Sequence, residues 1–204
     1  MLAAIIKHNH EFTDINKIKM EDINLTDEFI DSLKKWRDIQ SPGRYHELLK
    51  QLTGKWTVKL AFYSGDQKWE TNCKSENCLL HGDRFFMEQI DGDIYGPDEK
   101  GNMRPEPYSS TKILGYDNYK QAYCGSFIEN QNSYLLTFKG RYPLIGTQDK
   151  IDFYGLSDEP MLDIKDVAMK YSLIIIDNDR YKWEVFALAL GDNSKVFDFN
   201  FTRE

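Results

Sequence analysis

Two charged residues in the stretch 84–90 are well placed in the sequence to hold or act on a small molecule. Arg84, Phe86 and Glu88 stand at every second position, so an extended strand directs all three to one face. If that face lines an interior, the two charges either pair or wait for a polar ligand, because a buried unpaired charge is costly. If the face is outside, both charges are solvated. The sequence leaves the two orientations open.

The acidic and histidine-bearing segments offer little for a metal ion. A calcium loop needs oxygen ligands at positions 1, 3 and 5 and a glutamate at position 12. Counted from Asp91, position 5 is Tyr95 and position 12 is Asn102, so a solvated acidic loop is expected over 91–107. His8 and His10 lack a third ligand nearby, and the acids of 158–166 are expected on a surface loop. We therefore expect neither a metal nor a cofactor.

Nucleophilic chemistry has no visible support. His46 and His81 stand near no serine or cysteine with the pattern of a nucleophile elbow. The three cysteines are too few and too sparse for a disulfide framework, so free buried thiols are expected. The alternative that remains is an isomerase or a cyclase in which Glu88 or Tyr123 serves as acid or base within a cavity.

The composition narrows the partners. A formal net charge of −7 argues against nucleic acid and against an anionic membrane surface, which both attract concentrated positive charge. No apolar stretch approaches the length of a membrane span, and the N-terminus lacks the features of a signal peptide. A cytoplasmic protein, monomeric or homodimeric, is expected. Its 12 Phe, 12 Tyr and 4 Trp suit sheet interiors and a lined cavity.

The spacing of apolar residues changes from helical to alternating at 52–56, so helices are expected before this segment and strands after it. Residues 1–40 are expected to form an arm followed by an amphipathic helix, because Phe29, Leu33 and Trp36 recur at helical spacing. A second short helix is expected to open at 41–43, with Pro42 in its first turn, and to end at Gly54.

From Trp56 the apolar residues alternate, which predicts strands for the domain 41–204. The connections are too short for crossover helices, so pairing should be antiparallel, and closure would remove exposed edges. We predict a mainly β fold: one closed up-and-down barrel of about ten strands after two short helices. The expected strands are 56–63, 68–80, 84–90, 109–116, 121–129, 134–141, 150–154, 165–176, 181–190 and 195–203.

The residues assembled so far resemble the lipocalin-like barrels of the calycin superfamily. Their hallmark is a glycine and a tryptophan opening the first strand, here Gly54 and Trp56, with an arginine near the end of the last strand, here Arg203. The chain is also similar to a calycin-type family catalogued only as a domain of unknown function. The segments that carry this second likeness are 46–56, 82–85, 114–118 and 201–203.

The resemblance implies a barrel but no catalytic residues. It makes Gly54, Trp56 and Arg203 structural, and it directs the tryptophan face of the first strand inward. Fatty-acid-binding barrels are disfavoured because they place a helix pair between the first two strands. Haem-binding barrels resembling nitrobindins are disfavoured because every histidine here precedes residue 82.

A barrel of this size usually leaves room for one small ligand. The expected partner is therefore a small, largely apolar molecule, although for Trp183 the choice between an inward and an outward face stays open. A third alternative is a protein-interaction module that docks through the helix of Phe29, Leu33 and Trp36. The candidate ligand-binding residues are Val58, Leu60, Phe62, Arg84, Phe86, Glu88, Tyr123, Phe127, Tyr134 and Trp183.

Overall fold

The computed structural model describes residues 26–141, 150–159, 163–191 and 194–204. The chain divides into two compact units, Met1–Gln40 and Ser41–Glu204. His8 and His10 lie outside the described residues, as do the expected turn at 145–147 and most of the one at 191–193.

Helix α2 (Asp27–Gln40) belongs to the first unit and contains Phe29, Leu33 and Trp36, the residues whose spacing predicts it. The side-chain oxygen of Thr26 accepts a hydrogen bond from the Phe29 amide at 3.3 Å, and Asp27 and Glu28 occupy the first turn. No residue of this helix is buried. Within the described part of the chain, neither this helix nor any other has the length and apolarity to cross a membrane.

Helix α3 (Arg44–Lys50) opens the second unit, and its predicted start at Ser41 and Pro42 is wrong. The helix is capped at Gly43, whose amide donates a hydrogen bond to Nδ1 of His46 at 3.0 Å. The His46 side chain thus accepts the hydrogen bond of the N-cap amide, as a glutamate or glutamine at the same position does in a capping box. Leu49 in this helix and Leu52 just after it are each 1% exposed, so the helix and the segment that follows pack against the barrel through apolar side chains.

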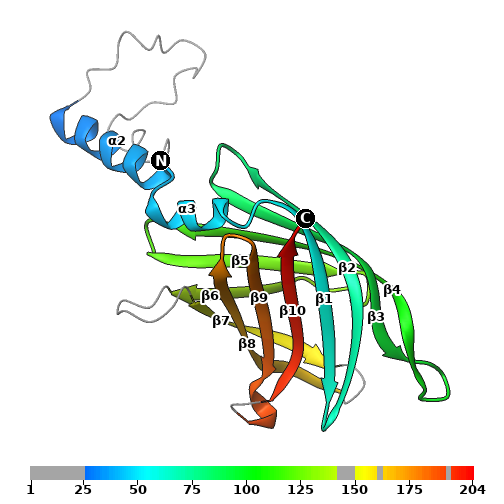
Figure 1. Ribbon diagram of the computed structural model, residues 1–204. Coiled ribbons are helices and arrows are strands. Elements are labelled where there is room, and N and C mark those ends of the chain that lie inside the picture. Colours follow the sequence, from blue (N-terminus) through cyan, green and yellow to red (C-terminus); the bar gives the residue numbers. More distant parts are fainter. Residues whose placement is uncertain (1–25, 142–149, 160–162, 192–193) are drawn as a thin grey trace, which may run out of the picture. The chain divides into compact units, whose positions relative to one another are not determined.

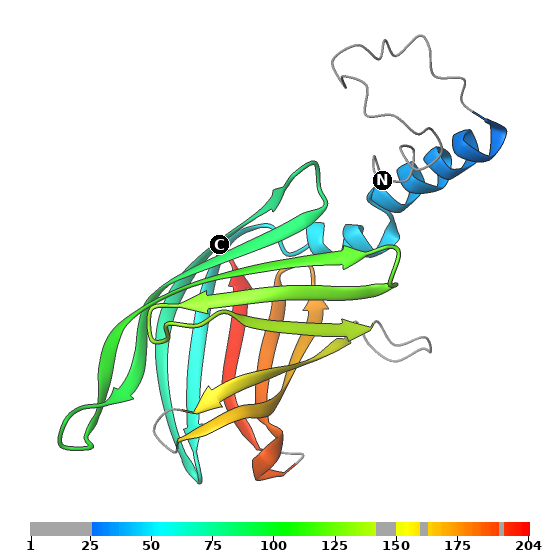
Figure 2. The same cartoon turned by 180° about the vertical axis from the view of Figure 1, so that it is seen from behind.

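Ten antiparallel strands close into a barrel in the order β1-β10-β9-β8-β7-β6-β5-β4-β3-β2, as the sequence predicts. Figure 1 shows consecutive strands as neighbours, with β1 and β10 completing the ring, and Figure 2 shows the opposite side. The strands are β1 (Gly54–Ser64), β2 (Gln67–Leu80), β3 (Phe85–Pro97), β4 (Met103–Asp117), β5 (Ala122–Glu129), β6 (Leu136–Arg141), β7 (Lys150–Glu159), β8 (Ile164–Asp177), β9 (Arg180–Ala187) and β10 (Lys195–Arg203).

The expected loop at 91–107 is instead a long hairpin of β3 and β4. Pairing continues to Pro97 and Met103, and only 98–102 form the turn. The glycines and prolines that conceal the strand pattern have structural uses. A Cβ at Gly92 would lie 2.7 Å from Cys73, and the prolines of β4 precede Ser110, where its pairing with β5 begins. Proline is tolerated there because no neighbouring strand requires its amide.

Three smaller strand boundaries also differ from prediction. Strand β9 ends at Ala187, and not at residue 190, because Leu188–Leu190 form a short 3-10 helix. Strand β7 continues to Glu159, so Asp158 and Glu159, two of the acids expected on a surface loop, belong to a strand. Strand β6 begins at Leu136, so Tyr134 lies in the connection that precedes it.

The corner at 52–56 is built as the sequence predicts. The Arg203 guanidinium lies over the Trp56 ring, with its carbon 4.1 Å from the ring centroid. The same guanidinium donates hydrogen bonds to the Thr53 and Gln51 carbonyl oxygens, both at 2.8 Å. It therefore satisfies backbone acceptors at the end of α3 while covering the indole. Gly54 has φ +117°, a backbone conformation that disfavours other residues.

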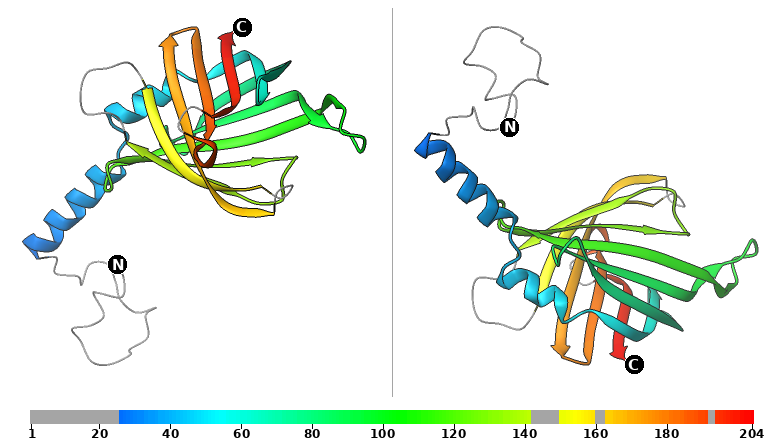
Figure 3. Two further views of the ribbon diagram at one scale, coloured as in Figure 1. Left: turned by 90° about the horizontal axis from the view of Figure 1, so that it is seen from below. Right: turned by 90° about the horizontal axis from the view of Figure 1, so that it is seen from above.

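The interior is densely packed beside α3 and more accessible elsewhere. Inward-facing Trp56, Phe86, Leu114 and Tyr123 are each 1% exposed or less. Further along the same inward faces, aromatic residues remain partly exposed although they pack against the core. These residues are Phe127, Tyr171, Phe197 and Phe199, together with Phe62, whose ring contacts that of Phe197. Figure 3 shows the ring of strands in two views turned by 90° from Figure 1. We call the part of the interior bounded by these five aromatics the open half.

Candidate ligand-binding site

A buried ion pair lies at the floor of the open half. Glu88 on β3 and Lys112 on β4 are direct cross-strand partners, and their side chains meet with Nζ 2.5 Å from Oε1. The side chains are 1% and 11% exposed. Burial lowers the pKa of Lys112, and the adjacent carboxylate partly offsets that effect. The opposite charges thus partly compensate one another in a place where either alone would be strongly unfavourable.

A chain of hydrogen bonds joins this pair to the corner. Tyr181 donates to Oε2 of Glu88 at 3.1 Å, and its oxygen accepts from the Asn77 amide at 2.8 Å. Asn77 also donates to the Leu52 carbonyl oxygen at 2.9 Å, which the Trp56 indole reaches at 3.1 Å. Burial and the neighbouring carboxylate raise the pKa of Tyr181, so this phenol stays a donor at neutral pH. Both carboxylate oxygens of Glu88 are therefore occupied.

Trp183 on β9 lies against the ion pair from across the interior. Nζ of Lys112 is 4.1 Å from the centre of the indole, and the Phe153 ring centroid is 5.4 Å away on another side. The residue is 2% exposed, yet its Nε1–H has no hydrogen-bond partner among the described residues. A buried donor without an acceptor costs about 1–3 kcal/mol, so this group requires a physical explanation.

A second group of polar side chains lies further along the inward face of β4. Tyr108 is 2% exposed, and its hydroxyl has no partner in hydrogen-bond geometry within the described parts of the chain. Glu129 and Ser110 lie near enough to influence its pKa, which burial raises. Burial likewise raises the pKa of the Glu129 carboxyl, although Tyr108 and Asn132 oppose the shift. Tyr108 is four residues from Lys112, about 13 Å along a strand.

The structure brings most of the sequence-predicted residues to the interior, at different depths. Val58 and Leu60 are buried in the wall, whereas Phe62 and Phe127 face the open half. Phe86, Glu88 and Trp183 face inward as well, which settles the orientation that the alternating pattern left open.

Three predicted residues do not line the open half. Arg84 does not face the interior: it is exposed in the turn before β3, and its guanidinium donates to the His81 and Gly82 carbonyl oxygens. The expectation fails because the strand begins one residue later. Tyr123 is buried beneath α3 and donates to the Tyr45 carbonyl oxygen at 2.8 Å. Tyr134 is half-buried and donates to the Asp158 carbonyl oxygen at 3.0 Å.

Sequence reasoning missed the polar residues of the hydrogen-bond network around Glu88 and those of the second polar group around Tyr108. The signal that could have found Lys112 is its position on the inward face of β4, two residues from Ser110 and Leu114. Nothing in the sequence alone ties the remaining members to one site, because they come from strands far apart along the chain. The missed residues are Ser75, Asn77, Tyr108, Lys112, Glu129 and Tyr181.

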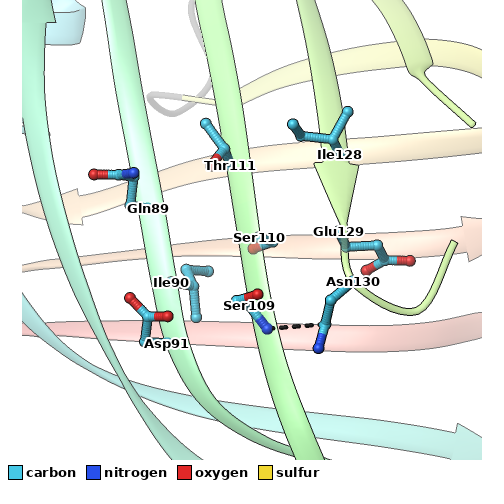
Figure 4. Close-up of a pocket in the computed structure, with 9 residues that line it drawn as sticks. All are labelled: Gln89, Ile90, Asp91, Ser109, Ser110, Thr111, Ile128, Glu129 and Asn130. Atoms are coloured by element: carbon cyan, nitrogen blue, oxygen red, sulfur yellow. Dashed lines mark hydrogen bonds between the residues drawn. The ribbon is translucent and has the colours of Figure 1, made fainter. Parts of the chain in front are cut away.

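The fold also forms a pocket of about 340 Å³ on β3, β4 and β5 (Figure 4). Most of its side chains belong to the outward faces of these strands, among them Gln89, Asp91 and Thr111. Across the described ranges, no three His, Cys, Asp or Glu side chains gather in a group that could hold a metal ion. The interior groups are thus the better candidate for recognising a molecule, because they combine burial with hydrogen-bond donors that have no acceptor in the part of the chain that the structure describes.

Comparison with known proteins gives a family and a fold. A family model described as "Protein of unknown function (DUF1579)" matches residues 41–203. The crystal structure of Rv2717c from M. tuberculosis is similar with a TM-score of 0.54 and 16% identity, covering 80% of this chain and 99% of that one. A redesigned beta barrel matches with a TM-score of 0.38 and 10% identity over 77% and 95% of the two chains, too low to support a conclusion. No curated protein sequence matches the chain.

Proposed function

The chain belongs to the family of proteins of unknown function DUF1579, and we propose that its barrel binds a small, largely apolar molecule in the open half of the interior. The observation that carries the proposal is the combination of partly exposed inward aromatics with a buried indole N–H that has no partner within the described residues. Ligand sites are typically apolar cavities with a few convergent polar groups, which is the composition found here.

The aromatic wall would supply most of the binding free energy. Removing apolar surface from water contributes about 25 cal/mol per Å². Phe127, Tyr171 and Phe199 come from three different strands, so a molecule among them would be covered on several sides. The buried polar groups would fix its orientation, because a ligand group that leaves them unsatisfied loses affinity.

We also propose that the barrel is lipocalin-like in the sense of the calycin superfamily. The support is the corner of Gly54, Trp56 and Arg203, in which a guanidinium covers the indole at the start of the first strand. A cytoplasmic location is part of the same proposal. It is supported by three cysteines that form no disulfide, of which Cys73 is buried.

Solvent extraction and native mass spectrometry of the purified protein test the binding function. A co-purifying small molecule that is lost when the protein is denatured is the expected result. A thermal-shift screen with apolar compounds should also raise the melting temperature, since a ligand that binds only the folded state stabilises it. If no molecule co-purifies and no compound in a broad screen shifts the transition, the proposal fails.

A further inference from the structure

We propose that the open half recognises a neutral carbonyl oxygen, which accepts hydrogen bonds from the Trp183 indole and the Lys112 ammonium. The inference rests on the proposed binding function and adds the chemical class of the ligand. Its basis is the balance of donors and acceptors at the floor of the site.

The donors there outnumber the acceptors. An indole N–H can only donate, and an ammonium carries three donors and no acceptor. The Lys112 ammonium donates one hydrogen bond to Oε1 of Glu88 at 2.5 Å, and the other oxygen of that carboxylate accepts from the Tyr181 hydroxyl. Trp183 Nε1 finds no acceptor among the described residues. The group that complements this floor is therefore an acceptor that the ligand brings.

The two donors border the same region. Nζ of Lys112 lies 4.1 Å from the centre of the indole to which Nε1 belongs. The ammonium lies over the face of the ring and the N–H projects from the edge of the same ring, and the two side chains come from β4 and β9. One oxygen with two lone pairs can accept from both, which matches a carbonyl better than a hydroxyl that must also donate.

The local charge favours a neutral ligand over an anion. The Lys112 ammonium is already paired with the Glu88 carboxylate, so the floor has no excess positive charge. A ligand carboxylate would place a second negative charge beside Glu88, and like charges at close range are unfavourable in a poorly solvated site. A ketone, an aldehyde, an ester or an amide brings the acceptor without that penalty.

The position of Tyr108 defines the far end of the site. Its buried hydroxyl, without a partner in the described part of the chain, lies on the same strand face about 13 Å from Lys112. Ile90 and the Phe127 ring supply apolar surface along the interval, and Ser110 and Glu129 lie at its Tyr108 end. The site therefore fits a molecule with a carbonyl at one end, an apolar body, and space for a second polar group near Tyr108.

Matched fluorescent probes test this inference. The ketone 6-propionyl-2-dimethylaminonaphthalene and its deoxo analogue, 6-propyl-2-dimethylaminonaphthalene, differ only at the carbonyl. Trp183→Phe keeps an aromatic ring and removes the donor. It should weaken ketone binding about tenfold, the worth of one hydrogen bond of about 1.4 kcal/mol, and leave the deoxo probe nearly unchanged. Trp69→Phe, which removes an indole that stacks on Phe62, is the matched control and should affect both probes alike.

The infrared carbonyl stretch of the bound ketone provides a measurement on the wild-type protein, independent of whether Trp183→Phe folds. It should lie below its frequency in an aprotic solvent, as two donors predict. An unshifted stretch, equal weakening of both probes, or tighter binding of the matched 6-dimethylamino-2-naphthoate would overturn the carbonyl inference while leaving the binding function intact. If wild-type protein binds neither neutral probe, the result counts against the proposed function itself.

Discussion

Replacing Lys112 by methionine should destabilise the barrel severely, because it leaves the Glu88 carboxylate buried without its cation. Glu88 is 1% exposed, and Lys112 supplies the 2.5 Å contact to one of its oxygens. Breaking a buried ion pair in this way costs about 3–5 kcal/mol. Tyr181 still donates to the other oxygen, so we expect a loss near the lower end, about 3 kcal/mol.

A double variant separates the charge from the shape of the site. In Glu88→Gln with Lys112→Met no charge is buried, the volumes are nearly kept, and the amide oxygen can still accept from Tyr181. We expect its stability within about 1–2 kcal/mol of wild type, since a neutral replacement of a buried pair is often tolerated. The double variant should therefore fold while losing the ammonium donor.

Urea unfolding at pH 7, followed by circular dichroism and tryptophan fluorescence, measures both variants. The predicted order of unfolding free energy is wild type, then the double variant, then Lys112→Met. A loss below about 1 kcal/mol in the single variant would show that its carboxylate is not isolated in a poorly solvated interior. A double variant as unstable as the single one would refute the reasoning that charge, and not packing, causes the loss.

Three further predictions concern stability. Burial lowers the pKa of His46 below its ordinary 6.5, so the unfolded chain takes up a proton that the folded chain excludes. The free energy of unfolding should therefore fall as the pH drops below that value. His46→Asn should remove this pH dependence, and His81→Asn, at an exposed position, should not. Burial raises the pKa of Glu129, so above about pH 4.5 the unfolded chain loses a proton more readily than the folded chain, and the free energy of unfolding should fall. Glu129→Gln should therefore raise the melting temperature at pH 7 but not at pH 4. Gly54→Ala should cost about 1–3 kcal/mol in urea unfolding, because it forces a strained φ and a Cβ 2.8 Å from a guanidinium nitrogen. Gly43→Ala, at the cap of α3 with open space and no positive φ, should cost less than Gly54→Ala.

The barrel itself could be predicted because its determinants are local. Alternation of apolar residues locates the strands, and short connections exclude parallel pairing. The partnership of Trp56 with Arg203 follows from the resemblance, and their direct cross-strand pairing accounts for it. What the pattern could not show is how far β3 and β4 extend, since glycine and proline in 91–107 are used there inside strands and at an edge.

That one boundary concealed the most important pair in the site. The hairpin is centred on the turn at 98–102, so Pro97 faces Met103, and nine steps back along both strands Glu88 faces Lys112. A five-residue turn placed at 98–102, with Gly101 at φ +78° near its end, would have predicted the ion pair from sequence. Arg84 shows the converse error: the residue has the right parity, but it belongs to the turn before the strand begins.

The members contributed by distant strands could not be found in this way. Trp183 meets Lys112 only because the barrel closes and brings β9 across from β4. That its indole N–H meets no acceptor among the described residues is a property of three-dimensional packing, and alternation indicates at most that Trp183 shares a face with Tyr181. The chemistry of the site thus depends on long-range register, whereas the fold depends on local pattern.

The most direct test of ligand binding in the open half uses fluorine NMR of protein labelled with 5-fluorotryptophan. The chain has four tryptophans, and single Trp→Phe variants assign their signals. On titration with the naphthyl ketone, the resonance of Trp183 should shift most, that of Trp56 beneath the corner less, and that of Trp36 on α2 should stay unchanged. A saturable shift at Trp36 with none at Trp183, or no shift at any of the four, would contradict binding in the interior of the barrel.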